Sequence, residues 1–295
     1  MTTSPKRHRR LRLAGACAMT LALAAGAIVL PAVPAHAADP ITAADQSYFA
    51  YYHLDQARAK GYTGKGVTIA LIDGEVDTTV PELAGATIID KSPCTVTSSP
   101  FSKTHGTAIA SLLVSKTYGV APDATLLTYR TSLADDGDES GNECTFRNGN
   151  PIEDPTSLIN RAISDGAQII SISSSDENFD DATKWAIARA DALGVIVVSP
   201  MGNDAKDETN NGYSKWSGVV GVGAIDTTGK VADYSSWGQG TTTAAVGGPI
   251  IVRNYETGNK AAADGTSYST PLIAGFLALA KQKWPNATNN QLLQL

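Results

Sequence analysis

The segment Val67-Thr68-Ile69-Ala70-Leu71-Ile72-Asp73-Gly74 decides the fold. Its first six residues are apolar or β-branched, which predicts a strand buried on both faces, and Asp-Gly predicts the turn that ends it. Strands of this kind are typical of parallel sheets that helices cover on both sides. Similar strands are expected at residues 124–129, 168–172, 195–199 and 219–225.

Helical stretches alternate with these strands. We expect helices at residues 105–115, 156–165 and 180–193, and a buried helix at 272–284. This alternation predicts an α/β fold, a single domain with a doubly wound, mostly parallel sheet and helices on both faces.

The N-terminus has the pattern of an export signal. Five basic residues precede an apolar, alanine-rich stretch at 13–33, and Ala35-His36-Ala37 fits a cleavage site. We therefore expect a signal peptide at 1–37, a short extension at 38–60, a single folded domain at 61–295 and a secreted product. An uncleaved membrane anchor is the weaker alternative, because Pro31 and Pro34 break the segment.

Cleavage would change both the charge and the cysteine content of the chain. It leaves 18 basic residues against 29 acidic ones, a net charge of about −11, which argues against a nucleic-acid partner. We expect a monomer with no membrane span. Cys94 and Cys144 would remain, and in an exported chain they favour one disulfide across a loop of about 50 residues. Neither cysteine has a second Cys or His at the spacing of zinc ligands, so a zinc site is disfavoured.

An acidic, turn-rich loop occupies residues 135–143. Its oxygen atoms could hold calcium, but their spacing matches no calcium motif, so a solvated surface loop is the favoured interpretation.

Ser267 lies between a glycine turn and the apolar helix, in the segment Gly265-Thr266-Ser267-Tyr268-Ser269-Thr270-Pro271. At a helix N-terminus, unpaired N–H groups and the helix dipole stabilise negative charge. This setting suits a nucleophilic serine, and it equally suits a serine that caps the helix.

A serine nucleophile usually needs an imidazole base and a carboxylate. After cleavage only His53 and His105 remain. We expect His53, in an aromatic stretch, to pack or lie at an interface, and His105, which heads a helix, to be the base. Asp73 lies at the C-terminal end of its strand, where catalytic groups of parallel sheets gather, and Asp77 is the lower-ranked competitor.

Three segments, taken in the order Asp73, His105 and Ser267, resemble the active-site motifs of the subtilisin-like serine peptidases, or subtilases. The resemblance runs from about Gly61 to the C-terminus. It implies a serine endopeptidase that hydrolyses polypeptides without a metal or organic cofactor, with Asn203 as an oxyanion-hole donor. It also implies a substrate-binding edge at Ser173, Ser174 and Ser175.

The chain departs from the family pattern in several places. Gly74-Glu75 follows Asp73 where Ser or Thr and then Gly are usual, and Thr104 precedes His105 where Gly is common. Serines at 173–175 replace the usual glycines, from which we expect a narrower primary pocket.

The short extension resembles that of the mycosins, a subtilase branch, and suggests folding without a long pro-domain. A mycosin-like processing protease of narrow specificity is therefore one alternative. Mycosins usually end in a membrane helix. The helical pattern is still continuing at Leu295, so under this alternative we expect a longer chain that ends in a membrane anchor. A catalytically silent peptide-binding homologue is the alternative from another class.

Overall fold

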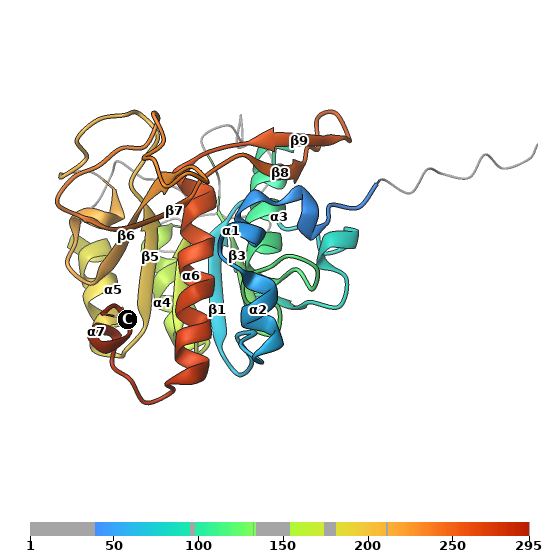
Figure 1. Ribbon diagram of the computed structural model, residues 1–295. Helices are drawn as coiled ribbons and strands as arrows, with labels where there is room; N and C mark the ends of the chain where they lie inside the picture. The colour runs from blue at the N-terminus through green and yellow to red at the C-terminus, as the bar shows by residue number, and fades with distance from the viewer. Residues whose placement is uncertain are drawn as a thin grey trace, which may run out of the picture. The chain divides into compact units, whose positions relative to one another are not determined.

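A computed structural model describes residues 39–94, 98–131, 133, 154–173, 181–210 and 212–294. Its main sheet has seven parallel strands in the order β2-β3-β1-β4-β5-β6-β7 (Figure 1). These strands are β1 (Thr68–Asp73), β2 (Thr87–Asp90), β3 (Thr125–Arg130), β4 (Ile169–Ile172), β5 (Ile196–Pro200), β6 (Val219–Ile225) and β7 (Thr241–Val246). The doubly wound α/β prediction is confirmed.

Helices cover both faces of the sheet, and α6 crosses in front of it in Figure 1. The helical elements are η1 (Ala43–Asp45), α1 (Ser47–Tyr51), α2 (Leu54–Ala59), η2 (Pro81–Leu83), α3 (Pro100–Val114), α4 (Pro155–Ser164), α5 (Asp181–Ala192), η3 (Tyr213–Lys215), α6 (Thr266–Lys283) and α7 (Asn289–Leu292). Ile69 and Leu71 of β1 belong to the same core cluster as α3 and α6, whereas Ala70 and Ile72 belong to that of α4 and α5. Because successive strand side chains point to opposite faces, β1 must be apolar throughout.

The central helix α6 packs closely because it carries a glycine at its contact with the loop after α3. A Cβ atom at Gly275 would lie 2.5 Å from Cβ of Val120. Real side chains do not approach so closely, so any larger residue would push α6 outward.

Two predictions about helix positions need correction. Helix α3 begins at Pro100, with the Ser99 side chain accepting a hydrogen bond from the Ser102 N–H at 3.0 Å, so His105 lies in its second turn and not at its head. The start of the helix is determined by the serine cap and by the proline at the first helical position. The apolar pattern begins only later in the helix. Helix α6 begins at Thr266 and not at the predicted residue 272, so Pro271 lies inside it.

Residues 39–60 form a segment that we call the N-terminal arm, and from residue 39 onward the described chain belongs to one compact unit. Ile41, Tyr48 and Leu54 of the arm are buried in the core cluster of α3 and α6. The Tyr48 hydroxyl donates to the carbonyl of Tyr118 at 2.9 Å. His53 is exposed instead of packed, because its neighbour Leu54 takes the buried position.

An antiparallel hairpin, β8 (Ile250–Arg253) and β9 (Lys260–Ala263), forms a second sheet. The arm is bonded to this hairpin: the Gln46 side chain donates to the Ile251 carbonyl at 2.8 Å and accepts from the Ile251 N–H at 3.2 Å.

Some predicted features lie outside the described residues, namely Cys144, the acidic loop at 135–143, Ser174, Ser175 and the expected signal peptide. The disulfide between Cys94 and Cys144 therefore stays a prediction. Over the ranges that are described, none of the helices combines the length and hydropathy needed to cross a membrane.

Candidate active site

Asp73 and His105 form a direct pair at the C-terminal edge of the sheet. Nδ1 of His105 lies 2.7 Å from Oδ1 of Asp73, and the same oxygen accepts a hydrogen bond from the Gly74 N–H at 2.7 Å. The Asp73 side chain is fully buried and that of His105 is 9% exposed. The interior strand β1 supplies the carboxylate and α3 supplies the imidazole.

The electrostatics of the pair favour a charged imidazole. Burial lowers the pKa of His105, but the charge of Asp73 and the hydrogen bond to it outweigh burial, so the pKa is raised above its ordinary value of 6.5. With Nδ1 held by Asp73, Nε2 is the ring nitrogen left for proton transfer.

The glycine after His105 allows α3 to approach the loop that follows β1. A Cβ atom at Gly106 would lie 2.5 Å from the Gly74 carbonyl oxygen and 2.6 Å from that of Glu75. This backbone-to-backbone contact sets the distance between the helix that carries His105 and the strand that carries Asp73.

Ser267 lies in the first turn of α6 and is partly exposed. The helix cap is Gly265, whose φ of 152° and ψ of 156° suit only glycine, so Ser267 is not the capping residue. The ring of Tyr268, the next residue, lies 5.6 Å from the His105 ring. Ser267 therefore stands in the first turn of a helix whose next residue, Tyr268, lies against the imidazole.

Asn203 follows β5 and is held by the residue before Ser267. Its Oδ1 accepts from the Thr266 N–H at 2.8 Å and from the Thr266 hydroxyl at 2.9 Å. The Gly202 N–H donates to the same hydroxyl at 3.2 Å. Because the amide oxygen is fixed in this way, the Nδ2 group is left to donate elsewhere. Thr266 stands within the motif of Ser267, but nothing in the sequence pattern distinguishes its role from that of its neighbours.

The remaining candidates differ in what the structure shows of them. Ser173 follows β4 and is buried, and its Oγ has no hydrogen-bond partner among the described residues. Asp77, the competing carboxylate, bonds to Thr79 and Tyr255, and it is Asp73 that pairs with His105. Within the described part of the chain, no group of three or more His, Cys, Asp or Glu side chains is placed to hold a metal ion.

A carboxylate–imidazole pair, a helix-terminal serine and a side-chain amide are the groups that serine hydrolases use, and all of them lie on elements of this doubly wound sheet fold. The chain matches the family model for the subtilase family over residues 64–295, and it belongs to this family.

The chain is similar to several characterised proteases. It is 29% identical over 253 residues to the thermostable alkaline protease of Halalkalibacterium halodurans, covering 83% of this chain and 64% of the relative. It is 29% identical over 259 residues to subtilisin E of Bacillus subtilis, covering 82% of this chain and 63% of the relative. The chain thus spans a little under two thirds of the length of these relatives.

Solved structures agree with the family. The prenylagaramide maturation protease PagA superposes with a TM-score of 0.64 at 25% identity, covering 81% of this chain and 84% of that one. A cold-adapted subtilisin-like serine proteinase superposes with a TM-score of 0.61 at 23% identity, covering 79% and 81%, which supports the fold.

Proposed function

We propose that this chain is a serine endopeptidase in which Asp73, His105 and Ser267 form the catalytic triad and Asn203 stabilises the oxyanion. The observation that carries the proposal is the buried 2.7 Å contact between Asp73 and His105, next to the α6 N-terminus that holds Ser267. Family membership supports the assignment of these roles.

The proposed reaction begins when Oγ of Ser267 attacks a peptide carbonyl carbon and Nε2 of His105 takes the hydroxyl proton. Asp73 stabilises the imidazolium that forms. His105 then gives the proton to the leaving amine as the C–N bond breaks, which leaves an ester between Ser267 and the acyl group. Water attacks this ester by the same route, so the proton returns to Ser267 and the acid product leaves.

The oxyanion of each tetrahedral intermediate needs donors that are in place before the reaction. The Nδ2 group of Asn203 and the backbone N–H of Ser267 are the proposed donors, and the bonds from Thr266 keep the Asn203 amide in one orientation. Preorganised donors of this kind contribute about 10²- to 10³-fold to turnover each. His105 carries every proton transfer, so the proposed steps call for no metal or organic cofactor.

The substrate in this proposal is a polypeptide. The same proposal includes secretion after cleavage at Ala37, a Cys94–Cys144 disulfide and a monomeric state. It divides the chain into a signal peptide at 1–37, an extension at 38–60 and a catalytic domain at 61–295. Side chains at Ser174 and Ser175 would narrow the primary pocket, because the usual glycines would leave more room there for the substrate backbone. Profiling a peptide library would test this, and a preference for large aromatic residues before the scissile bond would count against it.

A processing protease of narrow specificity is the second candidate. The similarity to PagA, a prenylagaramide maturation protease, favours it. Such an enzyme would cleave few sites and leave most proteins intact, whereas a catalytically silent homologue would cleave none.

The test uses the secreted protein and its Ser267→Ala variant with casein, a peptide library and a fluorophosphonate probe. An endopeptidase of broad specificity cleaves casein and reacts with the probe, and the variant does neither. Reaction with the probe without casein cleavage favours the processing protease. If the unaltered protein neither reacts nor cleaves any peptide, the endopeptidase proposal is wrong.

A further inference from the structure

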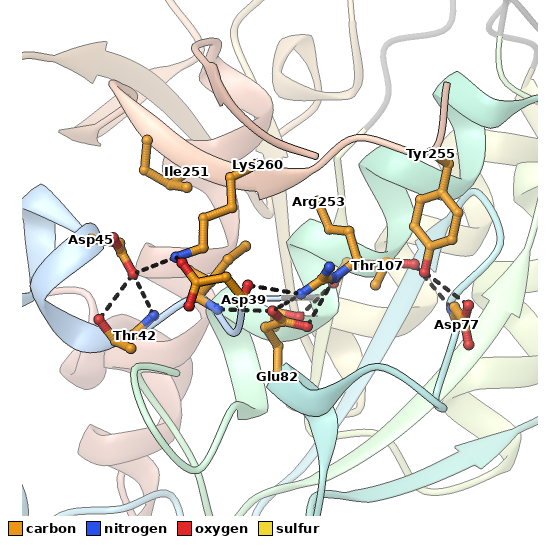
Figure 2. A network of polar contacts seen from close by, with 12 residues as sticks. Asp39, Thr42, Asp45, Asp77, Glu82, Thr107, Ile251, Arg253, Tyr255 and Lys260 are labelled. Carbon is orange, nitrogen blue, oxygen red and sulfur yellow. Dashed lines mark hydrogen bonds and ion pairs between the residues drawn. The ribbon is translucent and has the colours of Figure 1, made fainter. Parts of the chain in front are cut away.

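Tyr255, in the turn between β8 and β9, contacts the first turns of α3 although the two are far apart in sequence. Its backbone N–H donates to Oγ1 of Thr104 at 2.9 Å. Its hydroxyl donates to Oδ2 of Asp77 at 2.8 Å, a contact visible in Figure 2. Thr104 is the residue directly before His105.

Asp77 connects the same tyrosine to the other side of His105. The Asp77 N–H donates to Oγ1 of Thr107 at 3.0 Å, and Nζ of Lys103 lies 3.4 Å from Oδ2 of Asp77. Nζ of Lys103 also lies 4.9 Å from the centre of the Tyr255 ring. Tyr255 thus contacts two residues before His105 directly and one residue after it through Asp77.

The same contacts connect α3 to the strand that carries Asp73. Asp77 is in the loop that follows β1, and its carboxylate accepts several hydrogen bonds. Burial raises its pKa, but hydrogen bonds from Thr79 and Tyr255 and the charge of Lys103 outweigh burial and hold the pKa at about 2. Asp77 therefore remains a charged acceptor across the pH range in which a His105 base would work.

The hairpin that carries Tyr255 is itself fixed. Arg253 donates to the buried carboxylate of Glu82 at 2.6 Å, and Lys260 lies 3.1 Å from Asp39 and 3.3 Å from Asp45 of the N-terminal arm (Figure 2). Because the ion pairs hold residues on both strands of the hairpin, the position of Tyr255 between them is determined.

We propose that Tyr255 is a positioning residue for His105: it fixes the turn of α3 that carries the imidazole relative to the loop that follows Asp73. The inference rests on the proposed triad. It also gives a role to Thr104, one of the departures from the family pattern, because a glycine there would offer no hydroxyl to the Tyr255 N–H. Tyr255 itself is not proposed to touch substrate.

The test compares Tyr255→Phe with a matched control, Tyr129→Phe. Tyr129 also donates its hydroxyl to an aspartate, Asp165, at 2.7 Å, but it belongs to the core cluster on the other face of the sheet. With active sites titrated by a fluorophosphonate, Tyr255→Phe should lower kcat about tenfold and leave KM within about twofold, because small misplacements of a catalytic base slow the reaction. The control should change kcat by less than about twofold.

A second pair of variants removes the other contact. Thr104→Val deletes the acceptor of the Tyr255 N–H and should lower kcat in the same way, whereas Thr104→Ser keeps the hydroxyl and should retain most of the activity. If Tyr255→Phe fails to accumulate as folded protein, this pair decides the question.

A spectroscopic readout separates this inference from the proposed function. The low-field proton resonance of the His105 Nδ1–H group reports the pair with Asp73 whether or not the protein turns over a substrate. It should broaden or shift in Tyr255→Phe and Thr104→Val and stay unchanged in Tyr129→Phe. An unchanged resonance and unchanged kcat in both variants overturn the inference, whereas an unaltered protein without turnover overturns the proposed function alone.

Discussion

His105 donates through Nδ1 to a carboxylate of Asp73 that is fully buried, over 2.7 Å. The contact joins β1, an interior strand of the sheet, to the helix α3. Gly106 makes it possible because a side chain there would meet the backbone of Gly74 and Glu75. The buried carboxylate fixes both the tautomer and the orientation of the imidazole.

The first prediction concerns pH. A general base must be neutral, so kcat/KM should fall as the pH drops through the raised pKa of His105, with a midpoint above 6.5. Asp73→Asn should lower the plateau by about 10⁴-fold and move the midpoint down. A pH–rate profile checks both, and a midpoint at or below 6.5 in the unaltered enzyme would contradict the structure.

The second prediction concerns the oxyanion donor. Asn203→Ala should lower kcat by about 10²- to 10³-fold with little change in KM. Thr266→Val removes one of the two bonds that hold the Asn203 amide and should lower kcat less, about tenfold. Asn160→Ala, on the far helix α4, is the matched control and should leave kcat unchanged. Equal activity in Asn203→Ala and the control would exclude the proposed role.

The third prediction concerns the stability of the hairpin and the arm. Glu82 pairs with Arg253 in a largely buried site and also accepts from the Ile41 N–H at 2.9 Å. Removing one partner of a buried pair typically costs about 3–5 kcal/mol, so Glu82→Ala should lower the free energy of unfolding by about that amount. The pair of Lys116 and Asp123 has a similar length, 2.8 Å, but is exposed.

Asp123→Ala is therefore the control for Glu82→Ala and should cost less than about 1 kcal/mol. Denaturant titration measures both variants. Equal losses would mean that burial does not set the strength of the Glu82 contact.

The fourth prediction concerns Gly106. In Gly106→Ala the added methyl group would clash with two backbone carbonyl oxygens, which forces α3 away from β1. We expect a loss of about 1–3 kcal/mol in stability, together with a fall in kcat per titrated site, because His105 moves with the helix. A variant with normal kcat would show that the spacing of α3 and β1 does not matter for the reaction.

The fifth prediction concerns the cysteines. Peptide mapping of the unreduced, secreted protein should recover a linked pair of peptides containing Cys94 and Cys144. A disulfide across this loop would contribute about 3–4 kcal/mol. Two free thiols in the oxidised protein would show that this disulfide does not form.

The central strands were predictable because each is apolar on both faces, as β1 and β5 show. The edge strands were not. In β2 all four residues have some exposure, and β7 begins with three threonines, two exposed and one partly buried, so neither strand shows an apolar run. The hairpin of β8 and β9 is short and mixed in character, and no local pattern separates it from a loop.

The candidate site, like the sheet, was predictable only where a local sequence pattern marks a residue. Asp73, His105, Ser267 and Asn203 stand in local motifs, and the sequence alone was enough to name them, although their catalytic roles stay predictions. Tyr255 could not be found in this way. It bonds to Asp77 across 178 positions of the chain, so only the folded structure brings the two together.

Mass-spectrometric mapping of the residue that reacts with a fluorophosphonate shows whether Ser267 is the nucleophile, because the probe forms a stable bond only with an activated serine. We predict a single modified peptide, with the adduct on Ser267, and loss of this adduct in His105→Ala. Modification of another serine, or an adduct on Ser267 that forms equally fast without His105, would contradict this prediction.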